Sequence, residues 1–294
     1  MDLIAQFSAA LAARVASAAP VCVALTAGDW HGSGILWRPD VVVTSEEALG
    51  HRDSARVVLP GTTVAATLAG RDPATNVAVF RLDSPLPGTL PPAGGTPPVG
   101  SLALVLGADA AGAATGRLAM VHATGPEWHA MAGGRIDALI RLDVRLGADE
   151  GGPVLDAAGA FLGMAASGPR RRGLVIPAAT IARVVDPLLA DGRIARGFLG
   201  VGLRSVTISE DFRAEAGQAR GAMVLRLEPR SPAGAAGVLP GDILLALDGH
   251  RFGRGQRIVS LMGPERIGQP VALRLLRGAE AREVTVTVGA RPGG

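Results

Sequence analysis

The residues best suited to chemistry lie in one short stretch, residues 147–155, which reads Gly-Ala-Asp-Glu-Gly-Gly-Pro-Val-Leu. Two glycines and a proline after a polar turn let a chain bend sharply and present one side chain and several backbone N–H groups to a cleft. The side chain presented is Glu150. Further carboxylates stand at Glu46, Glu47 and Asp149, and such oxygens suit acid–base work or a hard cation.

Two further segments precede this stretch: residues 41–49, which contain Thr-Ser-Glu-Glu, and residues 70–79, which contain Asp-Pro-Ala-Thr-Asn. Together and in this order, the three segments resemble those of trypsin-like serine proteases of the high-temperature-requirement A (HtrA/Deg) type. In that family the stretch just described reads Gly-Asn-Ser-Gly-Gly-Pro-Leu, so the resemblance places Glu150 at the position of the nucleophilic Ser. Residues 41–49, Val-Val-Val-Thr-Ser-Glu-Glu-Ala-Leu, are similar to Leu-Thr-Asn-x-His-Val-Val, which places Glu47 at the catalytic His. Residues 70–79, Gly-Arg-Asp-Pro-Ala-Thr-Asn-Val-Ala-Val, are similar to Gly-x-Asp-Pro-x-Thr-Asp-Leu-Ala-Val, which places Asn76 at the catalytic Asp.

The resemblance continues to the C-terminal part of the chain. Residues 173–177 and 197–201 match, and so do residues 231–249, which contain Leu-Pro-Gly-Asp-Ile-Leu-Leu-Ala-Leu-Asp-Gly as in a PDZ domain. The implied fold is mostly β: a chymotrypsin/trypsin-like double β-barrel followed by an α+β PDZ domain. Short apolar runs separated by Gly, Pro and Asp agree with barrels. We predict a protease-like domain over 1–192 with its barrels joined near 85–100, a linker over 193–196, and a PDZ domain over 197–294.

The predicted triad positions lack the usual groups. A serine protease needs a hydroxyl that a neighbouring imidazole deprotonates, and a third group that orients the imidazole. A carboxylate attacking an amide would form a mixed anhydride, and Glu47, with an unperturbed pKa of about 4.3, is a poor base at neutral pH. We therefore predict that the chain is not an enzyme but a pseudoprotease that serves as an adaptor, a chaperone-like factor or a structural subunit.

Two other interpretations stay open. The acidic cleft of Glu47 and Glu150 could support hydrolysis of altered chemistry, with a cation held by these residues together with Glu46 and Asp149. Otherwise Glu47 and Glu150 share a proton or pair with the arginines at 170–172. The third interpretation is an active serine endopeptidase with an unrecognised nucleophile. The nearest candidates, Ser45 and His51, are predicted to lie on the wrong side of a strand and in a surface loop respectively. We expect no cofactor and no metal.

The PDZ resemblance implies a peptide-binding groove. Its loop would be Phe198-Leu199-Gly200-Val201, whose backbone N–H groups point at the terminal carboxylate of a peptide that adds as a strand. The other wall would be a helix over residues 256–262 that carries Ile258, Leu261 and Met262. We expect a protein or peptide C-terminus as the partner. The alternative is a groove that is occupied internally.

Composition limits the remaining function classes. The chain has 294 residues, a net charge of +3 and a pI near 10.6, but it contains no Lys and no Tyr, so only Arg raises the pI. That composition gives little support for nucleic-acid binding. Cys22 is alone in an apolar run and is predicted to be a core residue.

The apolar residues at 3, 4, 7, 11 and 15 predict an amphipathic helix, not a signal peptide or a membrane span. The sequence therefore indicates a cytoplasmic protein, with the periplasm as the alternative, and a homo-oligomer or a subunit of a larger complex.

Overall fold

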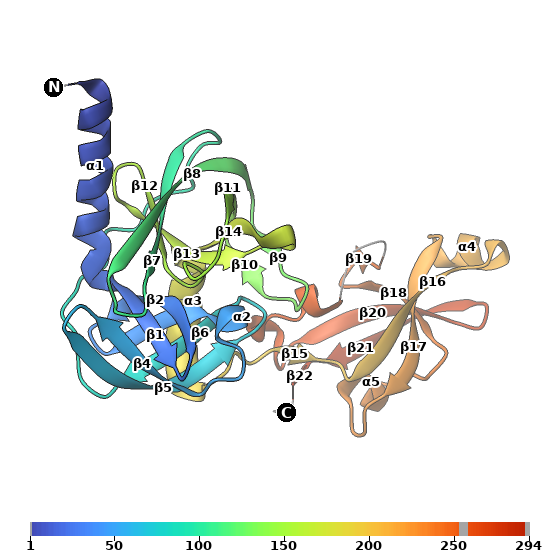
Figure 1. Ribbon diagram of the computed structural model, residues 1–294. Coiled ribbons are helices and arrows are strands. Elements are labelled where there is room, and N and C mark those ends of the chain that lie inside the picture. The colour runs from blue at the N-terminus through green and yellow to red at the C-terminus, as the bar shows by residue number, and fades with distance from the viewer. Residues whose placement is uncertain (1, 253–257, 292–294) are drawn as a thin grey trace. The chain divides into compact units, whose positions relative to one another are not determined.

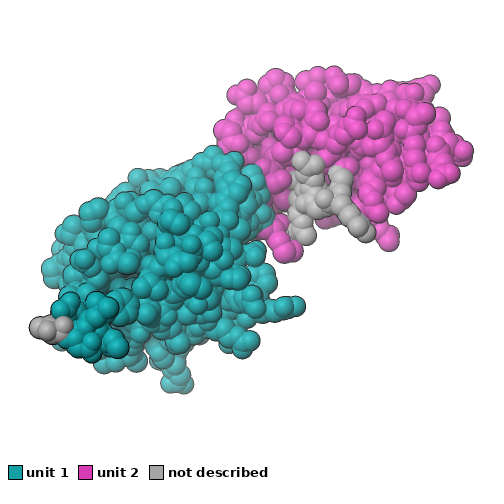
Figure 2. Space-filling view, turned by 90° about the horizontal axis from the view of Figure 1, so that it is seen from above, with its two compact units in different colours: residues 1–130, 135–194 teal, residues 131–134, 195–294 magenta. Residues whose placement is uncertain are grey.

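The computed structural model describes residues 2–252 and 258–291. The chain divides into two compact units, coloured separately in Figure 2. Unit 1 contains residues 1–130 and 135–194, and unit 2 contains residues 131–134 and 195–294. The predicted boundaries at 192 and 197 are close to this division, but they stay a prediction.

The first half of unit 1 is a closed six-stranded antiparallel barrel with the strand order β1-β2-β3-β6-β5-β4 (Figure 1). Strand β3 is buried along its whole length, and it ends at the first residue of the candidate site. Alternate side chains such as Val42 and Phe80 fill the barrel, whereas the intervening ones, such as Val43 and Val79, pack into a second core cluster that includes residues of the other barrel and of the helix at residues 178–191. The strands are β1 (Cys22–Ala27), β2 (Trp30–Arg38), β3 (Val41–Ser45), β4 (Ser54–Leu59), β5 (Thr62–Asp72) and β6 (Val77–Leu82).

The second half of unit 1 is another closed six-stranded barrel, ordered β11-β14-β13-β12-β7-β8 (Figure 1). The connector between the barrels, residues 85–100, forms no strand apart from a bridge between Ala93 and Phe161, in agreement with its many Pro and Gly residues. The strands are β7 (Leu102–Ala108), β8 (Ala114–Gly125), β11 (Leu139–Arg145), β12 (Pro153–Asp156), β13 (Phe161–Ser167) and β14 (Arg172–Pro177), with the small hairpin β9 (Trp128–His129) and β10 (Arg135–Ile136).

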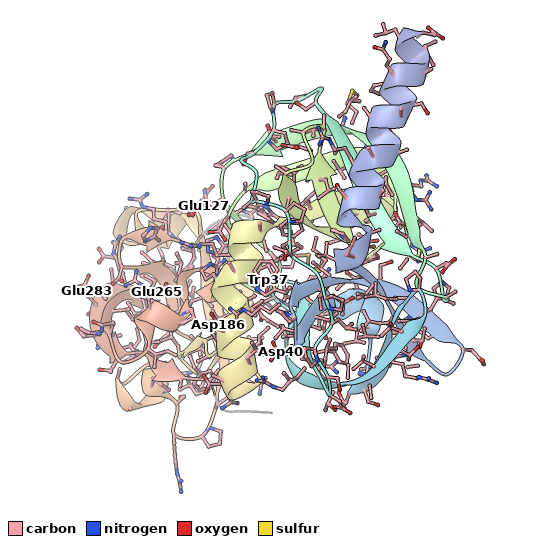
Figure 3. The ribbon with its side chains drawn as sticks, turned by 90° about the vertical axis from the view of Figure 1, so that its left-hand side faces the viewer. Trp37, Asp40, Glu127, Asp186, Glu265 and Glu283 are labelled. Atoms are coloured by element: carbon pink, nitrogen blue, oxygen red, sulfur yellow. The ribbon has the colours of Figure 1, made fainter. Side chains whose placement is uncertain are left out.

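The described part of unit 1 has three α-helices, α1 (Leu3–Ala18), α2 (Glu46–Leu49) and α3 (Ala178–Asp191), and two 3₁₀ turns, η1 (Ala19–Val21) and η2 (Pro169–Arg171). Helix α3 packs its apolar face on the core, and Asp186, labelled in Figure 3, makes a 2.7 Å ion pair with Arg38 of β2. A proline inside a helix removes a hydrogen bond and can end the helix early, but α3 continues past Pro187 to Asp191. Pro187 is exposed, so the carbonyl that loses its intrahelical donor can be hydrated.

Helix α1 is only partly packed. Leu11 and Val15 contact the core, whereas Leu3 and Ile4 are 78% and 74% exposed. Within the described residues, one stretch, Leu3–Val21, is long and apolar enough to cross a membrane by length and composition. This finding differs from our expectation of no such span. It is weak evidence, because a signal sequence or a helix of a soluble protein passes the same test.

Unit 2 is built on the sheet β16-β17-β18-β20-β21, with β19 (His250–Arg251) beside β18 and a separate pair of β15 (Gly197–Phe198) and β22 (Gly289–Ala290). The predicted helix over 256–262 is wrong for its described part, since Ile258–Leu261 forms only a 3₁₀ turn, η3, and residues 253–257 lie outside the described residues. The mostly-β fold class is confirmed. The other elements are β16 (Val201–Thr207), α4 (Glu210–Ala216), β17 (Arg220–Leu227), α5 (Pro232–Ala235), β18 (Ile243–Leu247), η4 (Pro264–Arg266), β20 (Pro270–Arg277) and β21 (Glu280–Thr287).

Candidate functional site

The candidate site of unit 1 centres on Ser45, Asn76 and Glu150. The Ser45 Oγ lies 3.0 Å from the Asn76 Oδ1 and 3.0 Å from the Glu150 Oε1. Ser45 ends β3 and caps α2 by accepting a hydrogen bond from the Ala48 N–H, and Asn76 occupies a left-handed turn before β6 with a φ of 57°. The prediction that Ser45 lies on the wrong side of its strand is therefore wrong.

Glu150 is held by a second serine. The Ser167 Oγ donates to the Glu150 Oε2 at 2.5 Å, and the Ser167 N–H lies 3.3 Å from the Oε1. The turn that presents Glu150 depends on Gly151, whose φ is +91° and whose Cα faces the Ser33 carbonyl and the Thr44 hydroxyl too closely for a side chain. The Glu150 N–H itself donates to the Gly147 carbonyl at 3.1 Å.

Glu47 takes a different position from the one expected. Its backbone N–H donates to the Asn76 Oδ1 at 2.8 Å, while its side chain is exposed. The structure therefore brings Asn76 and Glu150 together around Ser45, but it does not add the Glu47 carboxylate to them. His51 is exposed, as predicted.

The expected pairing of Glu150 with the arginines at 170–172 is wrong among the described residues, because Glu150 contacts serines instead. The alternative interpretation, a cation held by Glu46, Glu47, Asp149 and Glu150, has no support in the geometry of the described side chains either. Asp149 is buried against Arg117 at 3.2 Å, and Glu46 lies 3.6 Å from Arg71. Within residues 2–252 and 258–291 no group of three or more His, Cys, Asp or Glu side chains could hold a metal ion.

In unit 2 the predicted peptide-binding loop, residues 198–201, leads directly into β16. Gly200 has a φ of +72°, and a Cβ there would lie 2.3 Å from the Ser231 Cβ. The Leu199 and Gly200 carbonyls accept hydrogen bonds from Ala233 and Glu228, whereas their N–H groups donate to no described residue. Strand β16 pairs only with β17 in the described part of the sheet, so its other edge is available.

The other predicted groove residues differ in burial. Ile258 and Leu261 are partly buried against the core of unit 2, but Met262 is 4% exposed and belongs to that core together with Leu199. A cavity of about 360 Å³ lies between β16 and η3 and is lined by Leu203, Ile258 and other residues of unit 2. The assignment of Phe198, Leu199, Gly200, Val201, Ile258, Leu261 and Met262 to peptide binding stays a prediction.

Comparisons with known proteins agree with this two-part structure. The family description "Trypsin-like peptidase domain" matches residues 32–164, and "PDZ domain" matches residues 197–288. The chain is 30% identical over 275 residues to a probable periplasmic serine endoprotease DegP-like protein of Brucella suis, covering 89% of this chain and 53% of that protein. It is 27% identical over 288 residues to the chloroplastic Protease Do-like 1 of Arabidopsis thaliana, covering 89% of this chain and 64% of that protein.

Solved structures have the same fold. The HtrA-type protease AlgW with a tripeptide superposes with a TM-score of 0.71 at 25% identity, covering 96% of this chain and 98% of AlgW. The AlgW structure with a decapeptide has a TM-score of 0.75 at 22% identity, covering 96% of this chain and 99% of AlgW. Over both of its units the chain is similar to HtrA-type proteases. It spans about half the length of the Brucella relative that it matches.

One prediction is contradicted by these comparisons. The HtrA-type relatives are named serine endoproteases, so the prediction that this chain is not an enzyme is wrong on that evidence. Our reasoning placed Ser45 on the wrong side of its strand and did not consider Ser167. The hydroxyls of both serines lie against Glu150. The alignment of Glu47, Asn76 and Glu150 with the triad stays a prediction.

Proposed function

We propose that this HtrA-type protein binds the C-termini of proteins or peptides in its PDZ domain. The observation that carries the proposal is the pair of N–H groups of Leu199 and Gly200, which donate to no described residue beside the open edge of β16. Such N–H groups bind a carboxylate, and an open edge accepts a peptide as an additional strand. AlgW, with the same fold, has been solved with bound peptides.

Peptide binding can be measured by fluorescence anisotropy with two versions of one apolar peptide, one with a free C-terminal carboxylate and one amidated. We expect the free carboxylate to bind about ten- to a hundredfold more tightly, since hydrogen bonds to a charged group contribute about 1.5–3 kcal/mol. Gly200→Ala should remove this preference. The matched control is Gly237→Ala, because Gly237 also has a positive φ, +83°, but an open surrounding. Equal binding of both peptides would contradict the proposal.

A second candidate function is peptide-bond hydrolysis by a serine hydroxyl at the Glu150 cluster. The activity is taken from the names of the relatives, and the 2.5 Å contact between the Ser167 Oγ and the Glu150 Oε2 favours it here. A carboxylate in contact with a hydroxyl can accept its proton as the oxygen attacks a carbonyl carbon. Ser167 is only half-buried, whereas Ser45 is fully buried, so Ser167 is the accessible nucleophile.

A fluorophosphonate probe combined with casein digestion tests this hydrolysis. Labelling of one serine should be lost in Ser167→Ala and retained in Ser54→Ala, which changes an exposed serine at the start of β4. Unlabelled protein that leaves casein intact would refute the candidate. The outcome is independent of PDZ binding, because the two experiments use different sites and different ligands.

For location, we propose the periplasm, which is named for the Brucella and Halomonas relatives. The apolar stretch Leu3–Val21 supports export. Residues 1–21 fused to alkaline phosphatase should then give active phosphatase outside the bacterial cytoplasm. Inactive fusion protein retained in the cytoplasm would support the original cytoplasmic prediction instead.

A further inference from the structure

The second barrel of unit 1 contains a cavity that the candidate site does not use. Its volume is about 620 Å³, and its lining residues come from β8, β9, β11, β14 and the turn at residues 168–171. Leu139, Leu142 and Leu174 supply an apolar lining. The strands β11 and β14 shift in register between Arg141 and Arg145, so the ladder between them is interrupted where the cavity lies.

The polar side chains that line this cavity belong to three arginines, a tryptophan and a histidine, His122. Three arginines line it, Arg141, Arg170 and Arg172, and none of them forms an ion pair with a described residue. The cavity lining contains no Asp or Glu. Trp128 also lines it, and the indole Nε1–H is buried without an acceptor among the described residues. Because a buried donor normally has a partner, the Trp128 N–H lacks an acceptor that a ligand would provide. The exposed guanidinium groups are free to pair with an anion.

The turn that carries the arginines is held in an uncommon conformation. Arg170 and Arg171 both have positive φ values, 61° and 57°, which L-residues with long side chains rarely adopt. The turn is closed by hydrogen bonds from the Gly168 N–H to the Arg172 carbonyl at 2.8 Å and from the Arg171 N–H to the Gly168 carbonyl at 3.0 Å. A constrained turn holds the backbone that carries these arginines in one conformation before a ligand arrives, which reduces the backbone entropy lost on binding.

We infer that this cavity binds an acidic peptide segment in which an apolar side chain is next to an aspartate or glutamate. The leucines would contact the apolar side chain, the arginines would pair with the carboxylate, and the Trp128 N–H would donate to a peptide carbonyl. The buried Trp128 N–H beside the arginines favours a peptide, because a peptide offers a backbone carbonyl next to its apolar and acidic side chains. The site is separate from the PDZ groove, and binding there does not require that the peptide is cut.

The test uses the full chain and two acetylated, amidated hexapeptides that differ only in a central Leu-Glu or Leu-Gln. Blocking both ends removes the free carboxylate that the PDZ groove requires, so calorimetry reports on this cavity. We expect the Leu-Glu peptide to bind about tenfold more tightly and to quench tryptophan fluorescence. The difference should shrink at high salt, because the arginines are exposed and screened.

Arg172→Gln should abolish the preference for Leu-Glu, and it is the main variant because Arg172 has an ordinary φ of −72°. Arg56→Gln is the matched control, since Arg56 is an exposed arginine of β4 in the other barrel. Equal affinity for the two peptides, no binding of either, or an equal loss in Arg56→Gln would overturn the inference. So would binding to vesicles that contain phosphatidylglycerol, lost in Arg172→Gln, without any peptide preference, because that result would assign the cavity to a lipid headgroup.

Discussion

Unit 2 depends on one buried carboxylate, and replacing it should loosen the PDZ sheet. Asp242 is 2% exposed, and its two oxygens accept hydrogen bonds from the Arg277 Nε at 2.8 Å and the Arg277 Nη2 at 2.7 Å. The Leu239 N–H adds a third at 2.8 Å. Asp242→Asn removes the negative charge and leaves at least one of these donors facing an amide NH₂ group. The turn before β18 therefore loses hydrogen bonds to Arg277 or to the Leu239 N–H.

The size of the effect follows from how each partner is solvated. Breaking a buried ion pair costs about 3–5 kcal/mol. The Arg277 side chain is 30% exposed and can regain water after the change, so we discount the cost to about 2 kcal/mol. That free energy raises the ratio of open to closed unit 2 about thirtyfold, because each 1.4 kcal/mol is a factor of ten.

Hydrogen exchange measured by mass spectrometry reports on unit 2 within the full chain. Amides of β18 should exchange about thirtyfold faster in Asp242→Asn. The matched control is Glu280→Gln, which breaks an exposed pair with Arg282 and should change exchange by less than about threefold. If Asp242→Asn exchanges no faster than Glu280→Gln, the reasoning about the buried pair is refuted.

Acid should produce the same loosening in the wild type. Burial alone would raise the pKa of Asp242, but the hydrogen bonds from Arg277 and Leu239 and the charges of Arg277 and Arg282 outweigh burial and lower it. A carboxyl whose pKa is lower when folded stabilises the protein above its unfolded pKa of about 3.9, and this contribution is lost as the pH falls through the folded value. Wild-type exchange should therefore approach that of Asp242→Asn only below about pH 4.

Three further predictions concern unit 1. Burial raises the pKa of Cys22 to about 12, so the native thiol should not react with Ellman's reagent at pH 8. The denatured chain should release one equivalent of thionitrobenzoate, and a rapid reaction of the native chain would contradict the prediction. Thr180→Val should destabilise unit 1 by about 1–2 kcal/mol in urea denaturation, because the Thr180 hydroxyl accepts a hydrogen bond from the Asp137 N–H and donates one to the Asp137 carboxylate. An unchanged midpoint of the urea transition would contradict this prediction. Gly151→Ala should cost more than about 3 kcal/mol, since its Cβ would collide with neighbouring atoms at a positive φ; a soluble variant with the wild-type melting temperature would refute the steric argument.

The sequence predicted the fold well because turn residues and apolar runs are local signals. Cys22 is buried as predicted, and the Pro- and Gly-rich connector at 85–100 carries no strand. The sequence failed where a distant contact decides the outcome. The direction of Ser45 depends on Glu150, which is 105 residues away in the chain. The continuation of α3 past Pro187 likewise depends on the burial of its opposite face, which outweighs the lost hydrogen bond.

The contacts of Ser45 explain why Asn rather than Asp fits position 76. The Ser45 hydroxyl has one hydrogen but two oxygen acceptors at 3.0 Å, one on Asn76 and one on Glu150. The Asn76 amide cannot be flipped to supply a donor, because its Oδ1 already accepts the Glu47 N–H at 2.8 Å. An aspartate at position 76 would therefore place a second carboxylate against the Ser45 hydroxyl, which already contacts the Glu150 carboxylate. The neutral amide keeps the same acceptor geometry without that like-charge repulsion, so the residues at 76 and 150 are matched to each other through Ser45.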